Sequence, residues 1–223
     1  GVMGYSFWNP NEVYHFDPFF SGFDPSWDVR PLTDYVFNHP QYRKQYLAHI
    51  RTILSESMDL LALEQEVATM QSIIEGAASQ DGNSLFGMSQ FSNNVQNAFW
   101  ADWGFGGILS TVEARMDFLY SHAEVDVLDP TISAVQAVNG VIEASVSDAS
   151  TVELLWTNNL NGAEFESVEM ADLGVAGDFQ AGDGVYTASI PFEANAEFLF
   201  YIRASNQEAM SLKPVRAEYE LSL

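Results

Sequence analysis

The chain has 223 residues, 47% of them hydrophobic, so it is long enough to bury one or two hydrophobic cores. Its 31 acidic and 8 basic residues give a formal net charge of −23, which argues against nucleic acid and anionic membranes as electrostatic partners. The absence of cysteine excludes disulfides and cysteine metal sites, and no apolar run is long enough to predict a membrane span.

Acidic residues are spread over the whole chain. Residues 1–130 contain 17 acidic and 5 basic residues, and residues 131–223 contain 14 and 3. This distribution favours a general role of the charge in solubility. A surface that binds cations is the alternative interpretation.

The first 31 residues combine many aromatic side chains with four prolines. The prolines predict an irregular, extended segment, and the aromatic side chains need a surface to pack against. We therefore expect this segment to cover the helices that follow it. A surface that stacks on carbohydrate is the alternative. The aromatic residues on which this expectation rests are Trp8, Tyr14, Phe16, Phe19, Phe20, Phe23 and Trp27.

About four helices are predicted in the first half of the chain. The first begins near Pro40 and carries an apolar stripe that includes Leu47, Ile50 and Leu54. The second covers roughly 61–78 and ends before Asp81-Gly82. A third, shorter helix carries Phe91, Val95 and Phe99, and a fourth runs from the glycine-rich stretch 104–107 to about Ser121.

After Pro130 the hydrophobic pattern changes to a period of two, which is typical of strands. We expect an α+β chain of two domains: a helical domain over 1–130 and an antiparallel β-sandwich of immunoglobulin or fibronectin III type over 131–223. The predicted strands are 132–138, 141–147, 152–157, 164–170, 185–190, 197–204 and 217–223.

The stretch RPLTDYVFNHPQYRKQYLAHIRTIL, from Arg30 to Leu54, is followed in order by Met70-Gln71, Asp81-Gly82-Asn83, Phe91-Ser92-Asn93-Asn94 and Glu113-Ala114-Arg115. This ordered series over about residues 5–135 resembles the C-terminal part of the CotH family, which is related to atypical protein kinases. The resemblance implies an exported bacterial protein, secreted or at the cell surface, with its signal peptide upstream of Gly1.

In the CotH family a Trp-Asp-x-Asn or Trp-Asp-x-Asp motif supplies a metal-binding aspartate. The corresponding stretch here is Trp8-Asn9-Pro10-Asn11-Glu12, so the resemblance implies Asn9 and Asn11 as the nucleotide-site residues. Asn9 stands where the family has a carboxylate, which weakens the binding of Mg²⁺. The phosphate-binding lysine and the catalytic aspartate are expected upstream, so ATP and Mg²⁺ are expected only in the full-length parent.

A glycine-rich loop in the second half resembles a loop of sandwich domains in exported bacterial proteins. It runs from Met170 to Tyr186, and Leu173 replaces an aspartate that is usual there. Asp172, Asp178 and Asp183 lie among its glycines, which makes them candidate oxygen ligands for Ca²⁺. The alternative is that these aspartates cap turns for which the glycines supply a positive φ.

No other catalytic or metal motif is recognised in the sequence. The four histidines form no close metal-binding pair, and the stretch 104–107 lacks the spacing of a phosphate loop. We therefore expect a supporting and surface-attachment role without catalysis by this chain alone. Two alternatives stay open: a non-catalytic module that binds glycan or protein at the cell surface, and a degenerate kinase scaffold.

Overall fold

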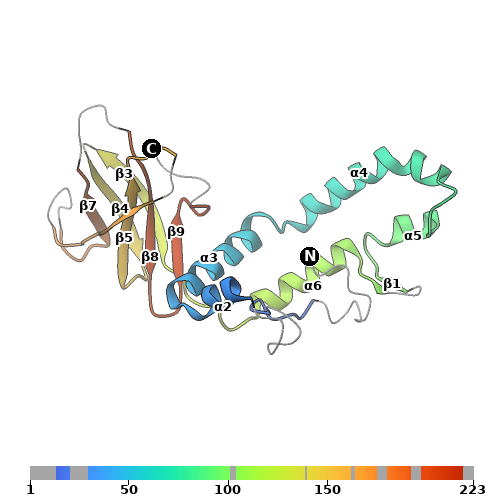
Figure 1. Ribbon diagram of the computed structural model, residues 1–223, viewed down its shortest axis with the longest axis horizontal. Helices are drawn as coiled ribbons and strands as arrows, with labels where there is room; N and C mark the ends of the chain where they lie inside the picture. The colour runs from blue at the N-terminus through green and yellow to red at the C-terminus, as the bar shows by residue number, and fades with distance from the viewer. Residues whose placement is uncertain are drawn as a thin grey trace. The chain divides into compact units, whose positions relative to one another are not determined.

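The computed structural model describes residues 14–20, 30–100, 104–138, 140–161, 164–174, 180–191 and 197–217. Over these residues the chain is a mixed α/β protein with five helices, two antiparallel sheets of three and four strands, and a two-stranded ribbon (Figure 1). The chain divides into two compact units. We call Gly1–Arg30 with Ile53–Asp126 the helical unit, and Pro31–Thr52 with Val127–Leu223 the β unit.

The helical unit is built around the long helix α4, Leu60–Gln80, which matches the helix predicted over 61–78. Asp59 begins the helix, because its carboxylate accepts the backbone N–H groups of Leu61 and Ala62 at 2.9 and 3.1 Å. Helix α4 contacts α5, Met88–Asn93, and α6, Ile108–Tyr120. The strands β1, Phe99–Trp100, and β2, Gly104–Phe105, pair between α5 and α6.

The sequence-based prediction for the third helix was wrong beyond Asn93. Val95 lies in a turn and Phe99 lies in β1. Asn94 ends α5: its side-chain amide donates to the carbonyls of Asn97 at 3.0 Å and Gly106 at 3.1 Å. These contacts to residues beyond the helix replace the bonds that another helical turn would make.

The described part of the aromatic N-terminal segment, residues 14–20, packs on α6. Arg115 of α6 donates hydrogen bonds to the carbonyls of Tyr14, at 2.9 Å, and Phe16. Its guanidinium also lies 5.3 Å from the ring of Phe118. The expectation that this segment covers the helices is therefore confirmed for residues 14–20.

The β unit consists of helices α2, Pro31–Asn38, and the larger part of α3, Pro40–Glu56, together with two sheets. The strand orders are β3-β4-β7 and β6-β5-β8-β9, with every neighbouring pair antiparallel. The strands are β3, Thr131–Val138; β4, Val141–Ser147; β5, Thr151–Thr157; β6, Glu166–Glu169; β7, Val185–Ser189; β8, Leu199–Ser205; and β9, Met210–Lys213.

Side chains from both sheets form one core cluster. Ile142 of β4, Leu154 of β5 and Ile202 of β8 are completely buried within it. The alternating burial along β4 follows the period of two that predicted this strand. A second, smaller cluster lies around Leu155, Tyr201 and Leu212, residues of the four-stranded sheet. The two sheets therefore pack through a common apolar interior.

Two features of the β unit were not anticipated. Strand β9 was not predicted, and the expected strand over 217–223 lies, apart from Ala217, outside the described residues. The helical residues Pro31–Thr52 cluster with the sheets, although the expected boundary at residue 130 assigns them to the helical domain. The division between the units falls within α3, because the first part of that helix packs on the sheets.

Candidate functional site

The glycine-rich loop of the β unit is the candidate calcium site. The two carboxylate oxygens of Asp172 accept the backbone N–H groups of Gly182 at 2.6 Å and Gly184 at 2.9 Å. Asp183 accepts the N–H of Val185 at 3.0 Å, and Gly182 and Gly184 both have positive φ. These contacts are those of carboxylates that cap turns.

The other predicted site residues lie elsewhere. Asp178, Asn9 and Asn11 are outside the described residues. Where the structure gives positions, no three histidine, aspartate or glutamate side chains come close enough together to hold a metal ion. Asp172 and Asp183 thus lie at the same turn of the loop. Among the described residues they do not form a group of three acidic ligands with another side chain.

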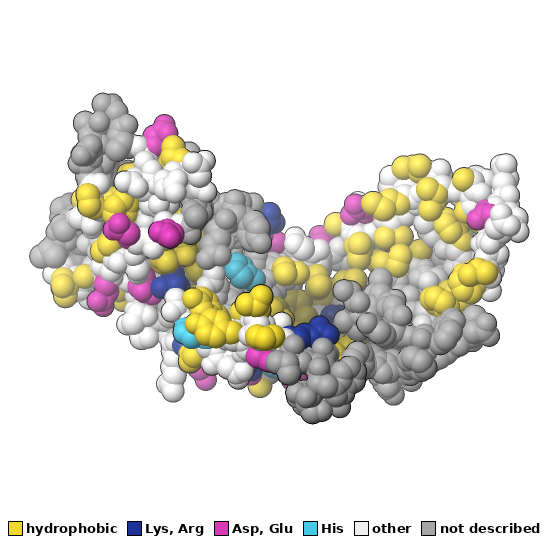
Figure 2. All heavy atoms as spheres, viewed as in Figure 1, with side chains coloured by type: hydrophobic (Ala, Val, Ile, Leu, Met, Phe, Trp, Pro, Cys, Tyr) yellow, Lys and Arg dark blue, Asp and Glu magenta, His cyan; other side chains and the backbone are white. Residues whose placement is uncertain are grey.

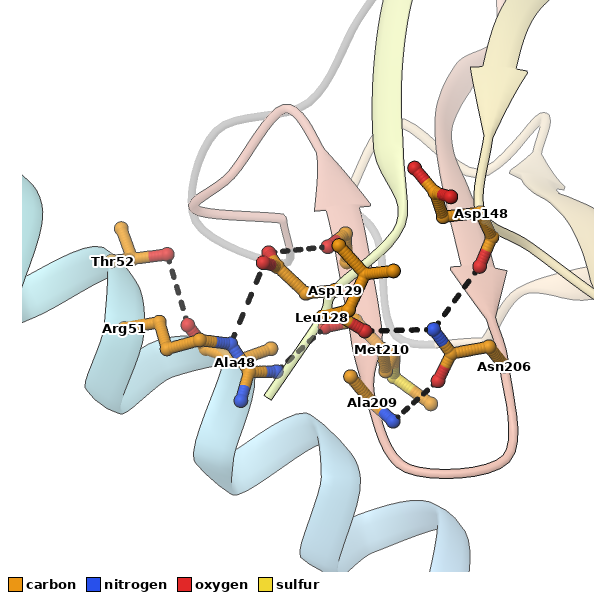
Figure 3. A network of polar contacts seen from close by, with 10 residues as sticks. Ala48, Arg51, Thr52, Leu128, Asp129, Asp148, Asn206, Ala209 and Met210 are labelled. Carbon is orange, nitrogen blue, oxygen red and sulfur yellow. Dashed lines mark hydrogen bonds and ion pairs between the residues drawn. The ribbon is translucent and has the colours of Figure 1, made fainter. Parts of the chain in front are cut away.

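A polar network joins α3 to the β8–β9 turn within the β unit (Figure 3). Arg51 donates to the carbonyl of Met210 at 3.0 Å, and its Nε lies 3.9 Å from the carboxylate of Asp129. Lys44, which precedes Arg51 on the same helix, donates to the carbonyl of Asn206 at 2.6 Å. The side-chain amide of Gln41 lies beside Arg203 of β8 and accepts from its guanidinium when the amide oxygen faces that group.

The spacing of Lys44 and Arg51 is seven residues, which is about two helical turns, so both side chains lie on the same face of α3. Arg51 is the more buried of the ion pair: its side chain is 15% exposed, against 48% for Asp129. Burial lowers the pKa of Arg51 below its ordinary value, and the charge of Asp129 partly opposes this shift. Burial therefore disfavours the charged form of the Arg51 guanidinium, and Asp129 offsets only part of this free-energy cost.

Asn206 is the centre of the same network. Its side-chain oxygen accepts the N–H groups of Glu208 at 2.9 Å and Ala209 at 2.7 Å. Its side-chain nitrogen donates to the carbonyls of Leu128 at 2.8 Å and Asp148 at 3.0 Å (Figure 3). One amide thus fixes the β8–β9 turn, the chain entering β3 and the turn after β4 to one another.

A polar cavity of about 470 Å³ lies at the end of the β5–β6 hairpin. Trp156 is 7% exposed, and its indole N–H is buried without a hydrogen-bond acceptor among the described residues. Amide, carboxylate and aromatic side chains complete the lining, a combination suited to a ligand with several hydroxyl groups. The lining residues are Trp156, Thr157, Asn158, Asn159, Glu164, Phe165 and Glu166.

An apolar groove of about 440 Å³ lies within the helical unit, between α4, α5, the β1–β2 ribbon and the start of α6. Its described lining contains no charged residue. Three of the four phenylalanines that line it are in ring contact: Phe99 and Phe105 stack at 5.0 Å between ring centroids, and Phe86 meets each of them edge-on at 5.1 Å.

Neither cavity was predicted as a site from the sequence. The hydrophobic pattern predicts Trp156 only as a strand residue, although the run Trp156-Thr-Asn-Asn159 places amides two and three residues after an aromatic residue. The groove residues carry no such signal, because an apolar side chain that lines a groove and one that fills a core look the same in a sequence.

Three of the four histidines have aromatic neighbours in the described part of the chain. His39 lies 4.6 Å from the ring of Tyr42 and 5.6 Å from that of Tyr35, and His15 lies 5.4 Å from Phe118. His122 accepts the N–H of Glu124 at 3.3 Å. None of these imidazoles belongs to a group of three possible metal ligands among the described residues.

The glycine-rich stretch 104–107 consists of β2 and the two glycines that lead from it into α6. A side chain at Gly107 would come within 2.7 Å of the backbone of Gln96, and one at Gly106 within 2.6 Å of the Thr111 hydroxyl. The backbone therefore needs glycine at Gly107 for close packing, and phosphate binding is not required to explain it.

None of the described helices is both long enough and apolar enough to cross a membrane. Comparison with known proteins gave no matching family model, no matching curated protein and no matching solved structure.

Proposed function

We propose that this chain is the supporting and surface-attachment part of an exported, CotH-like bacterial protein, and that it does not catalyse a reaction alone. The observation that carries the proposal is the attachment of α3 to the β8–β9 turn through Lys44 and Arg51. The CotH-like stretch Arg30–Leu54 corresponds closely to α2 and α3. The β unit thereby holds most of the first stretch of the series that resembles the CotH family, while the later stretches belong to the helical unit.

The strand order supports an immunoglobulin or fibronectin III type for the two sheets. The first, second and fifth strands of the β unit form one sheet, and the remaining four form the other in the order β6-β5-β8-β9. A tryptophan buried in the third strand, here Trp156 of β5, is a hallmark of immunoglobulin-like sandwiches. Modules of this type serve as rigid attachment units on many cell-surface proteins.

The charge of the chain supports a protein or glycan as the surface partner. At a net charge of −23, contacts with nucleic acid or anionic lipid are opposed by repulsion. In the proposed parent, ATP and Mg²⁺ bind upstream of this chain, which supplies structural support.

A nucleotide-dependent thermal shift tests this function. We expect ATP with Mg²⁺ to raise the melting temperature of the full-length parent and to leave that of this chain unchanged. Stabilisation of this chain alone by the nucleotide would contradict the supporting role. An unchanged melting temperature of both proteins would favour the non-catalytic binding module or the degenerate scaffold.

The polar cavity favours a second candidate function, the binding of glycan by the β unit. The carboxylates of Glu164 and Glu166, which line the cavity, would accept hydrogen bonds from sugar hydroxyls, and Trp156 and Phe165 supply aromatic surface beside them. The carboxylates also disfavour anionic sugars.

Calorimetric titration with neutral mono- and disaccharides tests the glycan function. Glu166→Gln should weaken binding, while Glu143→Gln on β4, which does not line the cavity, is the matched control. Equal affinity of both variants and the unaltered chain would contradict binding at this cavity.

A further inference from the structure

The apolar groove of the helical unit has walls that are fixed to one another. The side-chain amide of Gln71 in α4 donates to the carbonyl of Phe91 in α5 at 2.7 Å. On the other side, the N–H of Ile108 donates to the carbonyl of Asn94 at 3.1 Å, which ties α6 to the end of α5. The groove is thus formed in the absence of an occupant, which reduces the ordering cost of binding.

The wall that α4 contributes is exposed. Met70 and Ile74, which both line the groove, are 54% and 50% exposed, and no residue of this 21-residue helix is buried. Figure 2 shows hydrophobic side chains gathered over α4. A contiguous apolar surface of this kind is typical of a site that another protein segment covers.

The spacing of the α4 wall fits a helix. Val67, Met70 and Ile74 follow one another at intervals of three and four residues, so they form a straight stripe about 10 Å long. A helical segment that lies in the groove would place apolar side chains at the same intervals against this stripe.

The part of the chain that forms the groove is strongly acidic. Residues 53–126 contain eleven acidic residues and one basic residue, Arg115, which is bonded to the carbonyls of Tyr14 and Phe16. Glu66 lies four residues before Met70, and Glu75 lies four residues after Gln71, so both carboxylates flank the lined face of α4. This charge favours a cationic occupant and opposes a second copy of the chain, whose net charge is −23.

We propose that the groove binds an amphipathic helix whose apolar face is flanked by lysine or arginine. The apolar side chains of this helix fill the space between Met70, Ile74 and the three phenylalanines, and its basic residues pair with Glu66 and Glu75. This partner site belongs to the helical unit and goes beyond the supporting role of the β unit, so either proposal can fail while the other holds.

A synthetic peptide of leucine and lysine tests the proposal. The probe has about 18 residues, arranged so that leucine recurs every three to four positions, and carries a fluorescent label for anisotropy measurements. A peptide of the same composition in scrambled order has the same charge without the apolar face. We expect the patterned peptide to bind at least about tenfold more tightly than the scrambled one.

The substitution Ile74→Gln should weaken binding of the patterned peptide about tenfold, because it removes an apolar contact from the groove. Ile73→Gln is the matched control: Ile73 is adjacent in the same helix, 75% exposed, and does not line the groove. The double substitution Glu66→Gln with Glu75→Gln should weaken binding and reduce its dependence on salt.

Three results would overturn the proposal. The first is equal affinity for the patterned and scrambled peptides, which would indicate attraction by charge alone. The second is an equal effect of Ile73→Gln and Ile74→Gln. The third is a dimer in sedimentation experiments that dissociates on Ile74→Gln, since this would identify a second copy as the occupant. Circular dichroism spectra of the variants establish that each is folded.

Discussion

Arg51 of α3 reaches the carbonyl of Met210 in β9 with one guanidinium nitrogen, at 3.0 Å, while the other two nitrogens are buried without hydrogen-bond partners among the described residues. The nearest carboxylate, that of Asp129, is 3.9 Å from Nε, an ion-pair distance that is too long for a hydrogen bond. Arg51 thus joins a helix to a sheet although much of its own hydrogen-bonding capacity is unused.

We expect Arg51→Met to cost less stability than Arg51→Ala. Methionine retains the apolar stem and removes a buried charge, so its cost should be within about 1 kcal/mol, whereas alanine also removes packing and should cost about 2–3 kcal/mol. Urea denaturation measures both values. Equal losses would contradict the view that the stem carries most of the contribution.

The stability contribution of Arg51 should not vary with pH between about 6 and 9. Its pKa is lowered in the folded protein, so the folded state binds this proton less tightly than the unfolded state does. Stability from this group would rise only as the pH approaches the lowered pKa, which is far above neutrality for arginine. The difference in unfolding free energy between the unaltered chain and Arg51→Met, measured across this range, should therefore be constant.

We expect Asn206→Asp to destabilise the β unit by about 2 kcal/mol or more. The aspartate keeps the oxygen that accepts from Glu208 and Ala209, but it replaces the donor to Leu128 and Asp148 with an oxygen that faces their carbonyls. Thermal denaturation measures the loss. Asn161→Asp, an exposed position in the β5–β6 loop, is the control and should change stability little.

The two interpretations of the glycine-rich loop differ in their response to calcium. If Asp172 caps the turn, Asp172→Asn should lower stability by about 1 kcal/mol in calcium-free buffer, because one acceptor for Gly182 or Gly184 is lost. If the loop binds Ca²⁺, millimolar calcium should raise the melting temperature of the unaltered chain and not that of Asp183→Asn. An unchanged melting temperature with calcium would count against the metal site.

Alanine at Gly184 should be more destabilising than alanine at Gly182. Both glycines have positive φ, at +87° and +79°, so each substitution carries a backbone cost of about 1 kcal/mol. At Gly184 the new Cβ would also lie 3.2 Å from the carbonyl oxygen of Val146, while at Gly182 nothing lies within 4 Å. Chemical denaturation of both variants should give the larger loss for Gly184→Ala, and the reverse order would contradict this account of the turn.

Local patterns in the sequence predicted the regular elements well. The helix over 61–78 and the strand over 141–147 were found within a few residues of α4 and β4. The third helix failed at Asn94, whose side chain bonds to Gly106, twelve residues away. Strand β9 is short, and its pairing with β8 depends on the turn that Asn206 fixes.

The sequence by itself determined three features: the acidity, the change from helical to strand periodicity near residue 130, and the glycines that have positive φ in the loop. Each of these features depends only on a residue's own type or on its near neighbours in the chain, through charge, hydrophobic period and backbone freedom. Only the tertiary structure decided that α3 packs on the sheets through Arg51, that Asn206 joins three segments, and that the apolar residues of α4 line a groove. These features depend on contacts between residues far apart in the chain, and hydrophobic pattern alone does not specify which partner covers an apolar face.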